Sequence, residues 1–156
     1  MQNPNFHSEA AQFVADAERA FNDQDVDAAI AGYAPSAILE VWTEGIYDRF
    51  EGTDTIAKAW SYIFSTFRDF RLSKTLISAD PDGAIVNEWN GSVSGKKVSY
   101  GLDLWWRNED AQVTRHKIVA HGHVVPYASL RGKLRWLFVH PGLSVRAVSA
   151  RRRSGL

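Results

Sequence analysis

The sequence predicts an α+β fold in which helices come first and an antiparallel sheet follows. Apolar residues recur at helical spacing in three stretches between residues 8 and 67, and strand-like segments fill residues 70–125. A block of helices followed by a block of strands is typical of α+β domains. The 156 residues suffice for one domain with a sizeable core.

The first two helices are predicted from capping residues and apolar spacing. Ser8 is expected to cap a helix over residues 8–23, and Asp25 a short second helix with Tyr33 on its apolar face. Pro35 then ends the helical stretch, because proline disfavours helix at the residue before it.

A strand is predicted over residues 37–42, with a short return strand over 46–50. Gly52 to Asp54 then open a third helix, whose apolar stripe indicates core packing. The stripe consists of Ile56, Ala59, Trp60, Ile63, Phe64 and Phe67.

The second half reads as an antiparallel meander. Its four strands are expected at residues 70–79, 84–93, 96–107 and 112–125. Turn sequences separate them, the strongest being Asp80-Pro-Asp-Gly83.

Composition narrows the protein's class. Cysteine is absent, which excludes disulfides and thiolate sites and fits a cytoplasmic protein. No apolar run is long enough to span a membrane, and the first residues do not resemble a signal peptide. No phosphate-binding loop, nucleophile elbow or zinc motif is present.

Charge divides the chain into an acidic body and a basic end. Residues 1–125 hold 11 basic and 18 acidic residues, whereas residues 126–156 hold 7 basic residues and no acid. We therefore expect a domain over 1–125 and a basic helical C-terminal extension over 126–156. The extension either docks on the acidic body or contacts an anionic membrane surface. Stacking aromatics are not interleaved with its charges, so we expect no nucleic-acid partner.

Three segments carry a family resemblance: Gly52 to Ile56, Phe67 to Phe70, and Gly101-Leu-Asp-Leu-Trp105 with its spacing to His116. With the order of elements, they make residues 8–123 resemble the nuclear transport factor 2-like superfamily, in its SnoaL-like branch. The resemblance implies a cone-shaped α+β barrel, with a ligand cavity between curved sheet and helices, and a homodimer. It implies the fold more strongly than any activity.

The resemblance also implies a role for one acidic residue, Asp103. In the ketosteroid isomerases, an acid matching Asp103 donates a hydrogen bond to the developing oxyanion, but their tyrosine and general base fall near Ala17 and Val41. In the epoxide hydrolases, an arginine and a second acid match Gly101 and Ile118. Neither set is complete, which leaves Asp103 with His116.

Side chains alternate between the two faces of a strand, and this alternation decides whether Asp103 points inward or outward. The alternate residues from Val98 through Tyr100 to Trp106 are the more apolar, so pattern alone would place them inward and Asp103 outward. The resemblance places Asp103 inward instead, and we follow it. A carboxyl group in an aromatic pocket should have a raised pKa, which suits acid/base chemistry.

His116 is expected to point inward, because Arg115 and Lys117 occupy the opposite phase. It is either a hydrogen-bonded core histidine or the partner of Asp103, which would orient the imidazole. His121 and His123 lack a third metal ligand, so we predict no metal site.

The functional hypothesis is a protein that binds a small hydrophobic, cyclic molecule, with Asp103 and His116 catalysing proton transfer (isomerisation, dehydration, hydration or cyclisation). Such chemistry needs no cofactor. The alternative is a non-catalytic ligand-binding or dimeric interaction domain of the same fold. The expected ligand-binding residues are Trp42, Trp60, Phe64, Trp89, Trp105 and Ile118.

Overall fold

A computed structural model describes residues 4–43, 46–80, 84–94 and 96–122, and these residues form three helices and a six-stranded sheet. The predicted extension over 126–156 lies outside these residues. The helices are α1 (Pro4–Asp23), α2 (Val26–Ile30) and α3 (Thr53–Thr66). The strands are β1 (Tyr33–Thr43), β2 (Ile46–Glu51), β3 (Phe70–Ala79), β4 (Ile85–Val93), β5 (Lys96–Arg107) and β6 (Val113–Gly122).

The α+β prediction is confirmed, but the sheet is mixed. Its strand order is β2-β1-β6-β5-β4-β3, and β1 pairs with β6 in parallel while every other pair is antiparallel. Parallel neighbours need a long connection, and here the chain from β2 through α3 to β5 lies between them in sequence. The sequence pattern showed the meander and did not show where β1 would join it.

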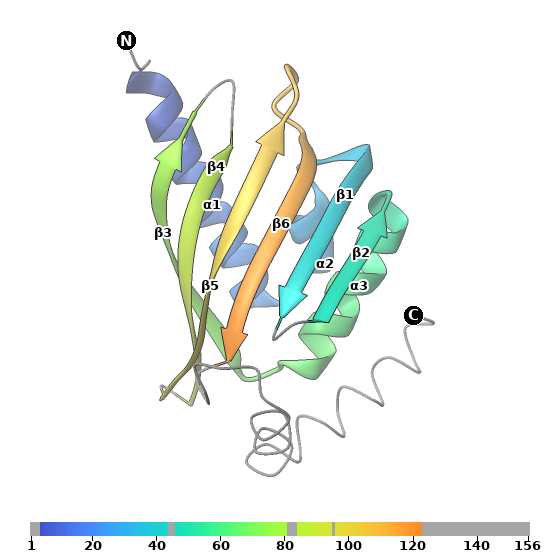
Figure 1. The fold of residues 1–156 in the computed structure, drawn as a ribbon, viewed down its shortest axis with the longest axis vertical. Helices are drawn as coiled ribbons and strands as arrows, with labels where there is room; N and C mark the ends of the chain where they lie inside the picture. The colour runs from blue at the N-terminus through green and yellow to red at the C-terminus, as the bar shows by residue number, and fades with distance from the viewer. Residues whose placement is uncertain (1–3, 44–45, 81–83, 95, 123–156) are drawn as a thin grey trace.

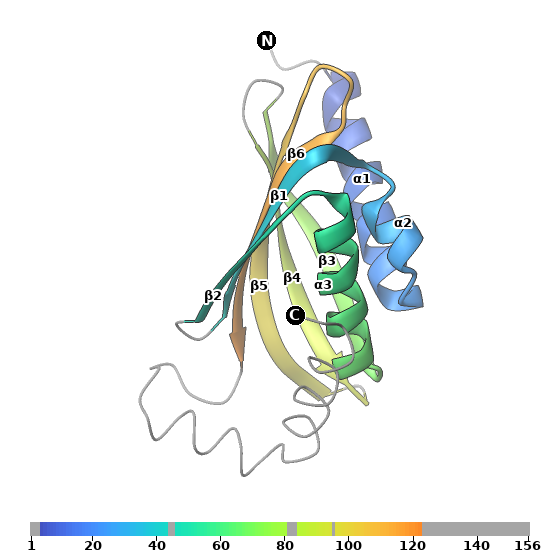
Figure 2. The same ribbon diagram turned by 90° about the vertical axis from the view of Figure 1, so that its right-hand side faces the viewer.

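The helices cover one face of the twisted sheet, which we call the inner face, and leave the other, outer face uncovered by any described helix (Figures 1 and 2). Side-chain to backbone hydrogen bonds fasten α1 to β3. The Asn22 amide donates to the carbonyl oxygen of Leu72 and accepts from its N–H, at 2.9 and 2.8 Å. Glu18 accepts from the N–H of Lys74 at 2.6 Å.

Two predicted boundaries are wrong for physical reasons. Helix α1 begins at Pro4, so Ser8 lies within it and caps nothing; proline suits a first helical turn because that N–H needs no partner. Strand β1 begins at Tyr33, which was expected in a helix. Pro35 is tolerated because the pairing with β6 is irregular between Tyr33 and Ile38. The Asp25 cap is confirmed by its hydrogen bond from the N–H of Ala28.

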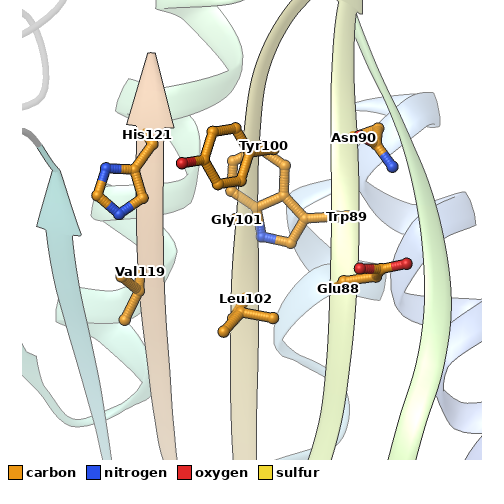
Figure 3. Close-up of a pocket in the computed structure, with 8 residues that line it drawn as sticks. All are labelled: Glu88, Trp89, Asn90, Tyr100, Gly101, Leu102, Val119 and His121. Atoms are coloured by element: carbon orange, nitrogen blue, oxygen red, sulfur yellow. The ribbon is translucent and has the colours of Figure 1, made fainter. Parts of the chain in front are cut away.

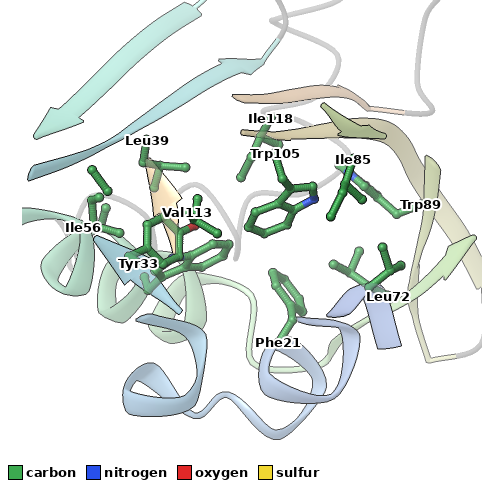
Figure 4. Packing of buried hydrophobic residues seen from close by; sticks show 14 of the residues in the cluster. Phe21, Tyr33, Leu39, Ile56, Leu72, Ile85, Trp89, Trp105, Val113 and Ile118 are labelled. Carbon is green, nitrogen blue, oxygen red and sulfur yellow. The ribbon is translucent and has the colours of Figure 1, made fainter. Parts of the chain in front are cut away.

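The core lies between helices and sheet, where aromatic and branched side chains from both layers meet (Figure 4). Phe21 of α1 contacts Trp60 and Phe64 of α3 edge to face, and Phe13 does the same to Trp105 of β5. Each such aromatic pair adds about 0.5–1.5 kcal/mol beyond the area it buries. This aromatic layer surrounds a small group of buried polar residues.

Candidate functional site

Asp103 lies at the centre of the inner face and is only 1% exposed. The inward orientation implied by the resemblance is therefore right, and the apolar phase of β5 faces outward. Three donors meet its carboxylate: Lys74 of β3 forms an ion pair with Oδ2, Asn87 of β4 donates to the same oxygen at 3.0 Å, and Trp89 donates to Oδ1 at 3.2 Å. A buried charge is tolerated only with such partners.

The register of the sheet brings these donors together. Asn87 is the direct partner of Asp103 on β4, and Trp89 is the partner of Gly101. Gly101 makes room for the Trp89 indole, because a methyl group at that position would overlap the indole ring and the carbonyl oxygen of Val119. The indole N–H can then reach the neighbouring carboxylate.

His116 lies on the other side of Asp103 and is equally buried. Its Nε2 is 3.5 Å from Asp103 Oδ1, an ion-pair distance without an aligned hydrogen bond. Its Nδ1 is 2.6 Å from the hydroxyl oxygen of Tyr33 on β1. The ring of Trp105 stacks on the imidazole at a centroid distance of 3.4 Å, and its N–H donates to Asn87. Imidazole and carboxylate are thus fixed in one network.

The surroundings set the protonation states. Burial alone would raise the pKa of Asp103, but Lys74 and then His116 outweigh it and hold that pKa well below its usual range. Burial lowers the pKa of His116 more than Asp103 raises it. Burial also raises the pKa of Tyr33 far above its usual range. The resting network is therefore an ionised Asp103, a neutral imidazole and a neutral phenol. The raised Asp103 pKa expected from the sequence is wrong, because the buried Lys74 was not foreseen.

Tyr33, His116, Asp103 and Lys74 form a linear chain of polar groups. When the proton of the neutral imidazole is on Nε2, the ring nitrogen 3.5 Å from Asp103, Nδ1 can accept the proton of Tyr33. A hydroxyl, an imidazole and a carboxylate in this order can move a proton in the way that catalytic triads do. The chain can thus act as a proton relay.

The expected ligand-binding residues separate into two groups. Trp60, Phe64, Trp89, Trp105 and Ile118 are all buried on the inner side. Trp60 and Trp105 are both ring neighbours of His116, at centroid distances of 6.2 and 3.4 Å. Trp42 lies apart from them: it is 43% exposed and packs against Tyr47 on the outer face.

Sequence reasoning missed Lys74, Asn87 and Tyr33. Lys74 shares its strand phase with Phe70, Leu72 and Leu76, so a cation in an apolar phase was the available signal. Tyr33 was missed because it was assigned to a helix. Asn87 alternates with the buried Ile85 and Trp89 on β4, which indicates an inward polar group.

A separate groove of about 390 Å³ lies on the outer face (Figure 3). Tyr100 stacks on His121 there, at a centroid distance of 5.3 Å. Glu88 and His121 are exposed on this face, and Glu40 pairs with Arg115 there at 2.6 Å, so none of them joins the inner network. His123 lies outside the described residues. The groove is lined by Glu88, Trp89, Asn90, Tyr100, Gly101, Leu102, Val119 and His121.

Among the residues the structure describes, no group of three or more histidine and acidic side chains is arranged to hold a metal ion. Within the same residues, no helix is long and apolar enough to cross a membrane.

Comparison with known proteins agrees with this fold. A sequence model of the SnoaL-like domain matches residues 12–116, from the middle of α1 to the catalytic candidate His116. The chain belongs to the SnoaL-like domain family. No curated protein matches the chain.

Solved structures of the SnoaL-like and related proteins share the fold at low identity. A SnoaL-like protein of unknown function from Burkholderia thailandensis E264 is 20% identical with a TM-score of 0.59, over 78% of this chain and 98% of that one. A protein with a cystatin-like fold from Silicibacter pomeroyi DSS-3 is 16% identical with a TM-score of 0.56, over 91% and 94%. A steroid delta-isomerase from Pseudomonas aeruginosa is 13% identical with a TM-score of 0.56, over 88% and 95%. These likenesses establish the cone-shaped fold of this SnoaL-like domain.

Proposed function

We propose that this SnoaL-like protein binds a small hydrophobic, cyclic molecule on the inner side of its sheet and catalyses proton transfer on it without a cofactor. The observation that carries the proposal is the buried chain Tyr33–His116–Asp103–Lys74. The aromatic side chains around that chain suit a flat, apolar ligand.

Each polar group has a distinct role in the proposed reaction. Asp103 stays ionised and orients His116, and Lys74 balances its charge. As the ligand gives a proton from carbon to the Tyr33 oxygen, the phenol passes its own proton to Nδ1 of His116. The resulting imidazolium faces the Asp103 carboxylate and returns the proton by the same route. Passing both protons together avoids a free phenolate, which burial makes costly.

Deuterium exchange tests this proposal without knowledge of the natural substrate. Wild-type protein in D₂O would be incubated with cyclohexanone, a cyclic enone and a cyclic 1,3-diketone, and loss of the α-proton signals followed by NMR. We expect accelerated exchange for at least one compound. His116→Gln should slow it by about 10²- to 10⁴-fold, the usual contribution of a general base.

His121→Gln is the matched control, because it changes a histidine on the outer face of the same strand. It should leave exchange unchanged. Equal exchange rates in wild type and His116→Gln would remove the catalytic assignment.

A second candidate function is ligand binding without chemistry. It is favoured by the near-complete burial of Asp103 and His116 and by the long Nε2 to Oδ1 distance of 3.5 Å. A ligand that binds with no deuterium exchange in any compound would support this candidate over the first.

We also infer that the partner of the outer face is a second copy of this chain. Trp42, Tyr47, Tyr100 and Leu102 are large hydrophobic side chains left at least 40% exposed on that face. Acidic and basic groups, such as Glu88 and Lys117, lie among them. A face with apolar groups and charges of both signs can be complementary to itself across a two-fold axis.

A further inference from the structure

The indole N–H of Trp60 is a buried donor that the proton relay does not use. Trp60 projects from α3, is only 6% exposed, and its Nε1 makes no hydrogen bond in the described part of the protein. Its ring stacks on Phe64 at a centroid distance of 5.5 Å, and Phe21 packs edge-on at 6.1 Å. Packing therefore holds this N–H in place on the inner side of the sheet.

The same indole lies beside the reacting groups. Its ring is nearly parallel to that of His116, with an interplanar angle of 23°. Nδ1 of the same imidazole is 2.6 Å from the Tyr33 hydroxyl oxygen, and the Trp60 N–H lowers the pKa of Tyr33, partly opposing the effect of burial. The Trp60 donor and the Tyr33 hydroxyl thus lie beside one imidazole ring.

An unpartnered buried N–H is uncommon in native proteins, because it forfeits its hydrogen bond with water. Tryptophan nitrogen is a donor only, so it can be satisfied only by an acceptor atom. A pure hydrocarbon ligand would leave the N–H unpaired, whereas a ligand oxygen would satisfy it. This one N–H group therefore favours a ligand that carries an acceptor atom over a pure hydrocarbon.

We propose that the Nε1–H of Trp60 binds an acceptor oxygen of the ligand next to the Tyr33 hydroxyl, so that the ligand class is an oxygenated ring compound such as a cyclic ketone. This inference rests on the proposed ligand site and adds the atom that orients the ligand within it. Trp60 is then a ligand-binding residue by its N–H as well as by its ring.

A pair of probes of equal shape isolates the oxygen. Cyclohexanone and methylenecyclohexane share one ring and differ by an oxygen in place of a CH₂ group. The full chain with ¹⁵N-labelled tryptophan would be titrated with each, and the six indole N–H signals followed by NMR. Cyclohexanone should bind about 2- to 13-fold more tightly, the worth of one neutral hydrogen bond, and should shift the Trp60 signal. Methylenecyclohexane should leave that signal nearly in place.

Trp60→Phe should abolish the preference for the ketone, while Trp42→Phe, on the outer face, should retain it. If Trp60→Phe folds poorly, the wild-type spectrum still decides, because the Trp60 signal is recognised by its proximity to the Phe64 ring.

Equal binding of the two probes, a ketone preference that survives in Trp60→Phe, or no shift of the Trp60 signal with either probe would each overturn this inference. The proposed function fails separately: deuterium exchange without a ketone preference leaves catalysis standing, and a ketone preference without exchange leaves the Trp60 inference standing.

Discussion

The two faces of β5 differ in a way that reverses the usual relation between polarity and burial. The inner face carries Gly101, Asp103 and Trp105, and all three are buried. The outer face carries Tyr100 and Leu102, which are 50% and 40% exposed. A carboxylate is thus buried while leucine and tyrosine on the same strand contact solvent.

The difference shows that partners, rather than the polarity of a single residue, decide which face is buried. Asp103 is stable inside because Lys74, Asn87 and Trp89 come from two neighbouring strands to meet it. The outer residues have no helix over them in the described structure (Figure 2). Substitutions on each face can test whether this account is correct.

The largest effect is expected from Lys74→Met. Removing the cation leaves the Asp103 charge buried without its main partner, which should cost about 3–5 kcal/mol of unfolding free energy in urea denaturation. The double variant Lys74→Met/Asp103→Asn should recover part of that loss, because a neutral amide needs no counter-charge.

Lys117→Met is the matched outer-face control. Lys117 lies over the Trp42 ring at 5.4 Å, so its removal should cost no more than about 1 kcal/mol. A cost below 1 kcal/mol for Lys74→Met as well would contradict the view that the inner network depends on charge balance.

The second largest effect is expected from Gly101→Ala on β5, with its neighbour Leu102 as the comparison. Gly101→Ala places a methyl group against the Trp89 indole and the Val119 carbonyl, so it should destabilise by about 1–3 kcal/mol or more. Leu102→Ala, on the outer face, should change the unfolding free energy by no more than about 0.5 kcal/mol when measured on monomer. Similar costs for the two would mean that the faces are not as different as their burial indicates.

The sequence predicts the positions of helices and strands better than the direction in which Asp103 points. Helix and strand positions follow from period and turn residues, and these were largely foreseen, including the Asp25 cap. The inward direction of Asp103 was not foreseeable from β5 alone, because the apolar phase of that strand points outward. It required the resemblance.

The polar partners of Asp103 and His116 were harder still to predict. Lys74, Asn87 and Tyr33 lie on three different strands, and only the register of β1, β3 and β4 brings the first two to the carboxylate and Tyr33 to the imidazole. Strand pairing is a long-range property that local pattern does not carry. A lone lysine in the apolar phase of one strand and a lone acid on another could have suggested the ion pair.

A third, smaller effect is expected from pH. The folded-state pKa values of His116 and Asp103 both lie below their unfolded values, so the unfolded chain binds more protons in acid. The stability contributed by neutral His116 should be lost as pH falls below about 6.5, and that from ionised Asp103 only as pH falls below about 4. Urea denaturation from pH 8 to pH 5 should show falling stability in wild type and a flatter profile in His116→Gln. An equally steep fall in that variant would assign the pH dependence to other groups.

The smallest effect on folding, and a large one on assembly, is expected from Leu102→Glu. The side chain is exposed on the outer face, so a charge there should leave the near-UV circular dichroism unchanged and alter the unfolding free energy of the monomer by about 0.5 kcal/mol or less. If a second copy covers this face, the introduced carboxylates face an apolar surface without partners, and sedimentation should change from dimer to monomer. Ser73→Glu, exposed on β3 at the sheet edge, should not change it. Wild-type protein that sediments as a monomer at all concentrations would leave the exposed apolar residues of β5 to some other partner and remove the dimer.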